Sequence, residues 1–138
     1  MAKFNIVGFE EVEKKLLQRE KATVEAVPEM LNAGAAVLVK AQQDEIERME
    51  IVDFRDMKNS VKATKIKGNE AERYVEVYPH GNDRKGVINA TKGFIAQYGK
   101  SNEPARPWMT VANEKCANEV RAAMLEVWEE KQNGRYNR

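Results

Sequence analysis

Residues 98–112 read YGKSNEPARPWMTVA, and this stretch decides how the second half of the chain folds. Pro104 and Pro107 fix their own φ at about −65° and push the residues before them toward extended conformations. The segment is therefore predicted to be a stiff, non-helical connection. It delivers Trp108 to the beginning of a last helix, where a large aromatic residue is expected to pack within the subunit or between subunits.

A long amphipathic helix is predicted to follow this connection. Thr110 is a suitable N-cap, to within one residue, and Gly134 supplies a stop signal. Up to Gln132, apolar residues recur at helical spacing on one stripe: Ala112, Cys116, Val120, Ala123, Met124, Val127 and Trp128. We expect Cys116 to be a buried, inert thiol on this stripe, and residues 133–138 to form a polar tail.

Two helices are predicted in the N-terminal half, after an extended segment at residues 4–7. Residues 10–20 place a small set of apolar side chains on one face: Phe9, Val12, Leu16 and Leu17. Residues 23–49 form a longer helical pattern, in which Pro28 either begins a new helix or kinks a continuous one. The run at residues 33–36 (Ala-Gly-Ala-Ala) makes this helix thin, so that another backbone can approach closely there.

The middle of the chain has strand character. Residues 60–78 are predicted to form an antiparallel hairpin with a turn at residues 68–70, and residues 94–98 a third strand. Residues 79–93 then form a long loop. The fold class is predicted to be α+β in one domain, residues 1–132: N-terminal helices, a small antiparallel sheet of three to four strands, and a long C-terminal helix packed on that sheet.

Composition excludes several classes of protein. Among 138 residues, 23 Lys and Arg are balanced by 22 Asp and Glu, whereas a dedicated nucleic-acid-binding domain has a basic excess. No apolar run approaches the roughly 20 residues of a membrane-spanning helix, and the N-terminus lacks the apolar region of a signal peptide. The single cysteine rules out an internal disulfide. These features predict a cytosolic protein without membrane partners.

No constellation of residues suggests catalysis. The one histidine, His80, lies in a Pro-His-Gly turn without a nucleophile motif. No set of residues has the spacing of metal ligands, and no Gly-rich segment has the pattern of a phosphate-binding loop. We therefore expect a protein that is not an enzyme and has no catalytic residue, cofactor or metal.

A basic hairpin is the first candidate for binding. Basic residues lie near Tyr74 and Tyr78, and basic residues interleaved with aromatic ones can bind single-stranded nucleic acid. They are Lys58, Lys62, Lys65 and Lys67, joined by Arg73. Alternatively, the lysines form a solvated outer face that protects an edge strand from aggregation.

The predicted loop at residues 79–93 is the second candidate. Arg84 and Lys85 precede Val87 and Ile88, an apolar pair in an otherwise polar segment. This pair either folds back on the core or forms a tip that binds a partner.

The chain also carries a family resemblance. An aromatic-Gly pair is followed by a polar run, by Pro-Ala-Arg-Pro and by Trp108, just before the last helix. Other segments fit the same pattern: residues 4–12, 33–37 and 59–61. The chain resembles the tail-completion or head–tail joining proteins (tail terminator-like) of long-tailed bacteriophages and prophages, over roughly residues 4–130. Its most specific element is the segment from Pro104 to Trp108.

The resemblance implies a virion component that forms a homo-oligomeric ring, is made in the bacterial cytoplasm, and contacts tail-tube and head-connector proteins. DNA would pass through without sequence-specific binding, and Lys62, Lys65 and Lys67 are candidates for facing the lumen. Candidate contacts with subunits or partners are Arg84, Lys85, Val87, Ile88, Pro104, Arg106, Pro107 and Trp108. Two alternatives stay open: a nucleic-acid-binding module that uses the hairpin, and an adaptor domain that binds a partner helix along residues 33–37.

Overall fold

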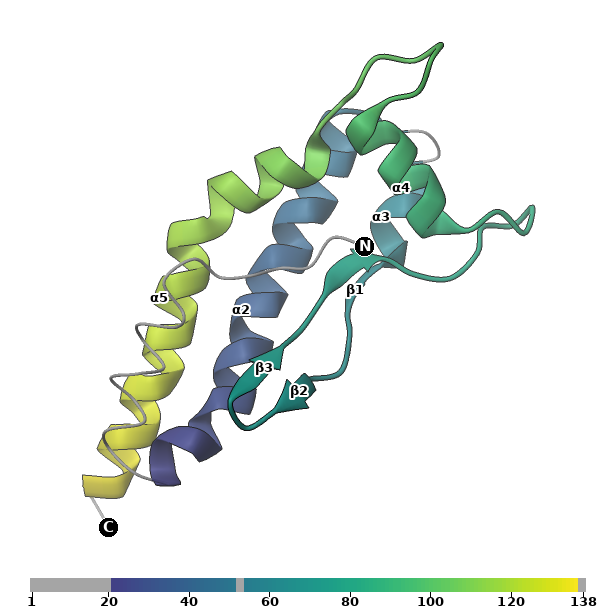
Figure 1. The fold of residues 1–138 in the computed structure, drawn as a ribbon. Helices are drawn as coiled ribbons and strands as arrows, with labels where there is room; N and C mark the ends of the chain where they lie inside the picture. Colours follow the sequence, from purple (N-terminus) through teal and green to yellow (C-terminus); the bar gives the residue numbers. More distant parts are fainter. Residues whose placement is uncertain (1–20, 52–53, 137–138) are drawn as a thin grey trace.

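The computed structural model describes residues 21–51 and 54–136 as four helices and four short strands (Figure 1). The α+β class, the antiparallel strands and the long C-terminal helix are confirmed. The segments predicted at residues 4–7 and 10–20 lie outside the described residues. In chain order the elements are α2 (Lys21–Arg48), α3 (Phe54–Ser60), β1 (Val61–Ala63), β2 (Lys67–Asn69), β3 (Glu72–Tyr74), β4 (Val77–Pro79), α4 (Asn89–Tyr98) and α5 (Trp108–Tyr136).

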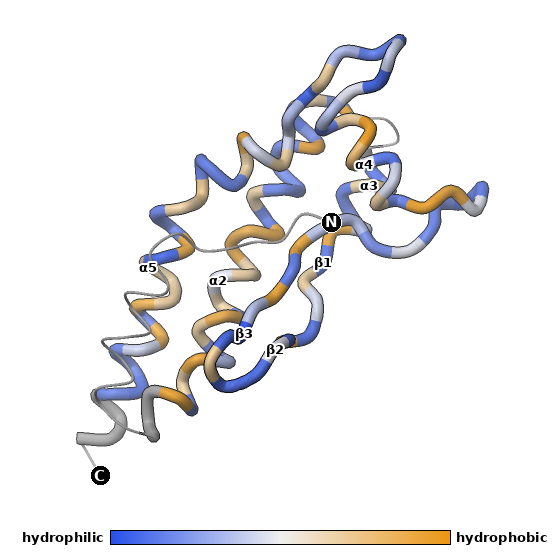
Figure 2. The backbone as a smooth tube through the Cα atoms, in the orientation of Figure 1, coloured by the Kyte–Doolittle hydropathy of each residue, from blue (hydrophilic) through white to orange (hydrophobic). Residues whose placement is uncertain are grey.

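Helices α2 and α5 lie side by side and form the body of the molecule (Figure 1). Hydrophobic residues recur along both helices between hydrophilic ones (Figure 2), and α5 packs mainly on α2 instead of on the strands. Gly34 lets the two helices approach closely: a Cβ there would lie 3.1 Å from Val120 Cγ1 and 3.1 Å from Met124 Cγ. The predicted thin face of α2 is therefore confirmed as a site of close packing, and α5 of the same chain covers Gly34.

Pro28 lies inside a continuous α2. Proline has no N–H, so the carbonyl oxygen of Val24, four residues earlier, loses its helical donor. Arg73 of β3 replaces that donor, because its Nη1 donates to Val24 O at 3.1 Å. The same hydrogen bond attaches the strands to the beginning of α2.

The strands form one antiparallel ribbon in two sections, as the predicted hairpin requires. Strand β1 pairs with β4, and β2 pairs with β3 around a turn in which Asn69 Oδ1 accepts the backbone N–H of Ala71 and Glu72. The ribbon lies on the side of α2 opposite α5 (Figure 1). Gln42 of α2, which is 1% exposed, donates to Val77 O at 3.3 Å and fixes β4 against the helix.

The strand predicted at residues 94–98 is wrong, because these residues form the second half of α4. Phe94, Ala96 and Tyr98 alternate as in a strand, but the buried residues follow a helical period: Asn89, Gly93, Ala96 and Gln97. The predicted long loop is correspondingly shorter and covers residues 80–88. Helix α3 was also not predicted; it occupies residues that precede the hairpin.

Helix α5 begins at Trp108, two residues before the predicted cap at Thr110. The reason is a cap from another element: Gln97 Oε1 of α4 accepts the N–H of Met109 at 2.8 Å and of Thr110 at 3.4 Å. The helix also continues through Gly134 to Tyr136, so the predicted stop at Gly134 is wrong.

Candidate functional site

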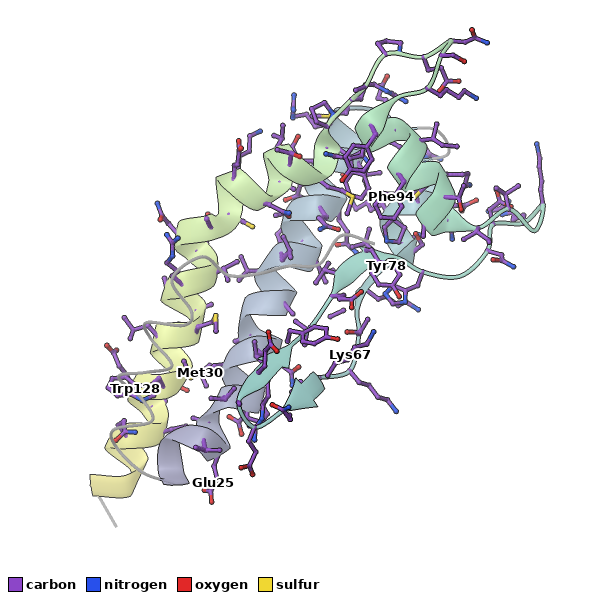
Figure 3. All side chains as sticks on the ribbon, viewed as in Figure 1. Glu25, Met30, Lys67, Tyr78, Phe94 and Trp128 are labelled. Atoms are coloured by element: carbon purple, nitrogen blue, oxygen red, sulfur yellow. The ribbon has the colours of Figure 1, made fainter. Side chains whose placement is uncertain are left out.

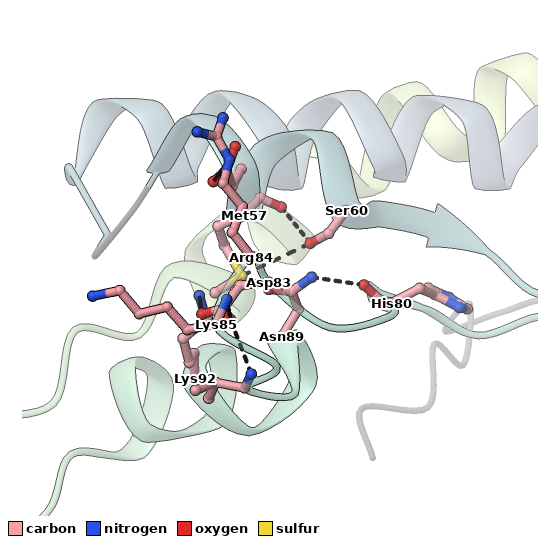
Figure 4. Close-up of polar contacts among 10 residues, drawn as sticks. Met57, Ser60, His80, Asp83, Arg84, Lys85, Asn89 and Lys92 are labelled. Carbon is pink, nitrogen blue, oxygen red and sulfur yellow. Dashed lines mark hydrogen bonds and ion pairs between the residues drawn. The ribbon is translucent and has the colours of Figure 1, made fainter.

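The loop between β4 and α4 is organised around one carboxylate. Asp83 Oδ1 accepts the backbone N–H of Lys85 at 2.8 Å and of Val87 at 2.9 Å, and Oδ2 accepts Lys92 Nζ at 2.8 Å (Figure 4). Asp83 also pairs with Val87 through its own backbone N–H, which donates to Val87 O at 2.8 Å. These bonds hold the loop in one conformation and connect it to α4.

The charge of Asp83 is strongly favoured. The pKa of Asp83 is lowered to about 2, mainly by the hydrogen bond from Lys92 and next by the hydrogen bond from the N–H of Val87. The Asp83 and Lys92 side chains are only 9% and 14% exposed, so little water competes for this ion pair. The carboxylate is therefore anionic at any physiological pH.

The base of the loop is anchored as firmly. Asn89 Nδ2 donates to His80 O at 2.9 Å (Figure 4), and the N–H of Asn89 donates to Gly81 O at 2.9 Å. His80 donates its own N–H to Ser60 O at 2.8 Å and its ring Nε2 to Lys62 O at 3.0 Å. Its ring also stacks on Tyr78, with centroids 4.0 Å apart. His80 thus has a structural role in joining the loop to β1.

Residues 84–88 form the exposed end of this loop, called the 84–88 tip below. Val87 and Ile88 are 43% and 55% exposed, so the alternative in which they fold back on the core is wrong. They form a hydrophobic stretch in a hydrophilic loop (Figure 2). The Arg84 side chain extends into solvent, with its Nε 3.5 Å from Asp56 Oδ2. Lys85 is exposed as well. The tip therefore offers two cations and two branched apolar side chains on a preformed backbone.

Asp83→Asn is expected to loosen the tip without unfolding the protein, because the amide keeps an acceptor for the backbone but loses the charge that pairs with Lys92. Amide hydrogen exchange at Val87 should accelerate on the order of tenfold. In the wild-type chain the folded pKa lies below the ordinary value of 3.8, so the stabilisation is present above that value and is lost as the pH falls toward about 2. Hydrogen exchange detected by NMR measures the exchange rate of the Val87 amide, and a titration of the Asp83 carboxyl measures its pKa. Unchanged exchange at Val87 would show that Asp83 does not hold the tip.

The proline-bracketed segment has two different surfaces. Pro104 and Pro107 are exposed, and stay candidates for contact with a partner. Arg106 faces inward instead: its Nη1 donates to Met49 O at 3.2 Å and Glu50 O at 3.3 Å, and so caps the end of α2.

The Trp108 side chain lies inside the subunit. It is 0% exposed, and its indole Nε1 donates to Gly93 O at 3.0 Å. A Cβ on Gly93 would lie 3.2 Å from Trp108 Cζ2, so α4 presses directly on the indole ring. The structure therefore supports the alternative in which Trp108 anchors the core.

The three candidate lumen-facing lysines are exposed, but they differ in their contacts. Lys67 lies on the β-ribbon, on the far side of α2 from α5 (Figure 3), and its Nζ is 3.5 Å from the buried Glu76. Lys62 and Lys65 are exposed on the same ribbon. Glu70 and Glu72 in the β2–β3 section of the ribbon are exposed as well, which reduces the positive potential of the hairpin.

A groove between α2 and α5, with a volume of about 430 Å³, was not predicted. Its apolar lining comes from small and medium residues of both helices: Ala36, Val37, Ala41, Ala112 and Cys116. Burial raises the pKa of the Cys116 thiol, as expected of an inert cysteine.

The lining of this groove includes a buried carboxylate, Glu45, which has two exposed cationic partners and which sequence reasoning missed. Glu45 is 5% exposed and contacts Arg48 and Lys115, each at 2.7 Å. The hydrogen bond from Arg48, reinforced by Lys115, lowers the pKa of Glu45. Helical spacing could have indicated that Glu45 is buried, because Gln42 and Glu45 follow Leu38 at i+4 and i+7 on the buried face of α2.

Within residues 21–51 and 54–136, no three His, Cys, Asp or Glu side chains lie together in an arrangement that could bind a metal ion. None of the described helices has the length and apolar character needed to cross a membrane. No protein-family model, no curated protein and no solved structure matches the chain.

Proposed function

We propose that this chain is a structural subunit of a long-tailed bacteriophage or prophage, which joins or terminates the tail at the head–tail interface as a member of a ring. The observation that carries the proposal is the 84–88 tip: an exposed apolar and cationic tip on a loop locked by Asp83 and Lys92. The resemblance of residues 98–108 to tail-completion proteins supplies the biological setting.

A locked tip is suited to assembly for a physical reason. Ordering a flexible loop on binding costs conformational entropy at each contact. Here the hydrogen bonds of Asp83 and Asn89 fix the backbone before any partner arrives. The exposed Val87 and Ile88 then have apolar surface left to bury against a partner. Such a subunit holds its partners in a fixed arrangement and catalyses no reaction.

In this proposal the neighbours of the ring are tail-tube and head-connector proteins, and the exposed prolines at positions 104 and 107 belong to one of those contacts. Lys62 and Lys65 face the lumen, where modest positive potential suffices for non-specific passage of DNA. The mixed charges of the ribbon fit this role better than tight binding of nucleic acid.

The first test is the oligomeric state, measured by native mass spectrometry over a wide concentration range with negative-stain images of large species. We expect a closed ring whose share rises with concentration, because repeated head-to-tail contacts close on themselves when the rotation permits. A stable dimer at every concentration without a ring would contradict the proposal. Steeply salt-dependent DNA binding by the isolated subunit would favour the nucleic-acid-binding module instead.

If the isolated subunit is monomeric throughout, the test moves to virions. Deleting its reading frame from the phage or prophage that encodes it is expected to leave heads and tails unjoined in electron micrographs. Normal particles from the deletion strain would overturn the proposal.

A further inference from the structure

The α2–α5 groove has the dimensions and lining of a docking site. Its volume of about 430 Å³ lies within the range of roughly 300–1,000 Å³ that is common for binding pockets. The apolar part of its lining consists of three alanines, one valine and one cysteine from α2 and α5. Ala36, which belongs to this lining, is exposed.

The rim of this groove is charged, with an excess of carboxylates. Two lysines and three acids line it: Lys40, Lys115, Asp44, Glu45 and Glu119. Glu45 is already held by Arg48 and Lys115, and Lys40 makes only a loose, exposed pair with Asp44 at 3.4 Å. Asp44 on α2 and Glu119 on α5 are exposed on the two rims and can meet cations from outside.

The 84–88 tip is complementary to this groove both in hydrophobicity and in charge. Val87 and Ile88 offer two adjacent branched side chains for the apolar lining, while Arg84 and Lys85 offer two cations for Asp44 and Glu119. The tip and the groove are on different parts of the subunit, since the loop projects on the side of α2 opposite α5 (Figure 1). A contact between two different patches is heterologous, and it repeats from subunit to subunit.

We infer that the 84–88 tip of one subunit inserts into the α2–α5 groove of a second copy of this chain, and that this is the contact between neighbours. The inference rests on the proposed ring, for which it names the two surfaces. Val87 and Ile88 lie against the small residues of the groove. Arg84 and Lys85 pair with the carboxylates on its rims, where partial burial strengthens the pairing.

Site-directed cross-linking tests the contact directly. In a Cys116→Ala background, one variant carries Ile88→Cys in the tip and the other carries Ala36→Cys in the groove, with a mass tag on one of them. Mixed under mild oxidation, the two are expected to give a tagged–untagged disulfide-linked dimer. Its yield should exceed that of either variant alone on the order of tenfold, because docking raises the effective concentration of the two thiols.

Two controls make the result specific. Ser101→Cys, on another exposed loop, replaces Ile88→Cys as the matched control and should give only background cross-linking with Ala36→Cys. Reversing the tip charges with Arg84→Glu and Lys85→Glu should abolish the excess. Adding Asp44→Lys and Glu119→Lys to the groove variant should restore it, which a merely structural effect of either change would not do.

The outcomes separate this inference from the function that it deepens. Cross-linking no greater than the Ser101→Cys control overturns the tip-in-groove contact, even where native mass spectrometry finds a ring. Failure of the paired charge reversal to restore the yield also counts against it. A specific cross-link from a protein that forms no ring and is absent from virions would support the contact and overturn the proposed function.

Discussion

Trp108→Ala is expected to lower the free energy of unfolding by about 3–5 kcal/mol, the usual cost of removing a fully buried large aromatic side chain. Trp108 is 0% exposed, contacts α4 at Gly93 and begins α5. The substitution leaves a cavity between α4, α5 and Pro79 and removes the indole donor to Gly93 O. Because single domains are stable by only about 5–15 kcal/mol, this is a large share of the total. Urea unfolding followed by circular dichroism measures the loss.

Two matched variants separate the causes of that loss. Trp108→Phe keeps an aromatic ring but is smaller and lacks the N–H, so it should cost about 1–3 kcal/mol, from the reduced packing together with the lost hydrogen bond to Gly93 O. Leu125→Ala removes an apolar side chain that is 49% exposed on the same helix, and should change stability by less than about 1 kcal/mol. A Trp108→Ala variant as stable as Leu125→Ala would mean that the indole does not anchor the core.

Most of the helical framework and the ribbon could be predicted because their signals are local. The apolar spacing of α2 and α5 is set by which face each helix buries. The hairpin sequence has both alternation and a turn signal at residues 68–70, and the structure forms the turn between β2 and β3 at residues 70–71. Helix α4 was mistaken for a strand because Phe94 and Tyr98 alternate with Ala96. The same two rings are i, i+4 neighbours, stacked 6.0 Å apart on the helix.

The candidate site was only partly predictable. The local sequence pattern indicates which side chains are exposed, but it does not indicate the tertiary contacts that position them. Arg84, Lys85, Val87 and Ile88 stand out in sequence as charges beside an apolar pair, and all four are exposed. The ion pair of Asp83 with Lys92 spans nine residues. It forms because residues 89–98 are helical, whereas both Asp83 and Lys92 were predicted to lie in the loop at residues 79–93. The groove needs two helices far apart in sequence, and no local pattern indicates it.

Arg106 illustrates the same limit within the segment that decides the fold. The prolines on either side correctly predicted an extended connection. The partners of Arg106 are the carbonyl oxygens of Met49 and Glu50, more than 50 residues away, where α2 ends. A guanidinium between two prolines has no local acceptor, so only the tertiary structure determines its role. That role ties the connection before Trp108 to the far end of α2.

Gly99→Ala is expected to destabilise the fold by about 2–4 kcal/mol, through backbone strain and steric overlap together. Gly99 has φ 75° and ψ 176°, a region that essentially only glycine adopts. A Cβ there would lie 2.7 Å from Ala105 N and 2.8 Å from Glu103 O, which are backbone atoms with little freedom to move. To make room for the methyl group, the segment that contains Glu103 and Ala105 would have to shift. That segment is held in place because the Arg106 N–H donates to Ala96 O at 2.7 Å.

Gly86→Ala is the matched control for this prediction. Gly86 also has a positive φ, 82°, but an added Cβ would meet nothing within 4 Å, so only the cost of a left-handed backbone remains, about 1–2 kcal/mol. Urea midpoints of the two variants should therefore differ, with Gly99→Ala the less stable. Equal midpoints would mean that residues 103–105 yield freely to the new methyl group. In that case the connection before Trp108 would be compliant, and the rigidity argued from its prolines and from Arg106 would be wrong.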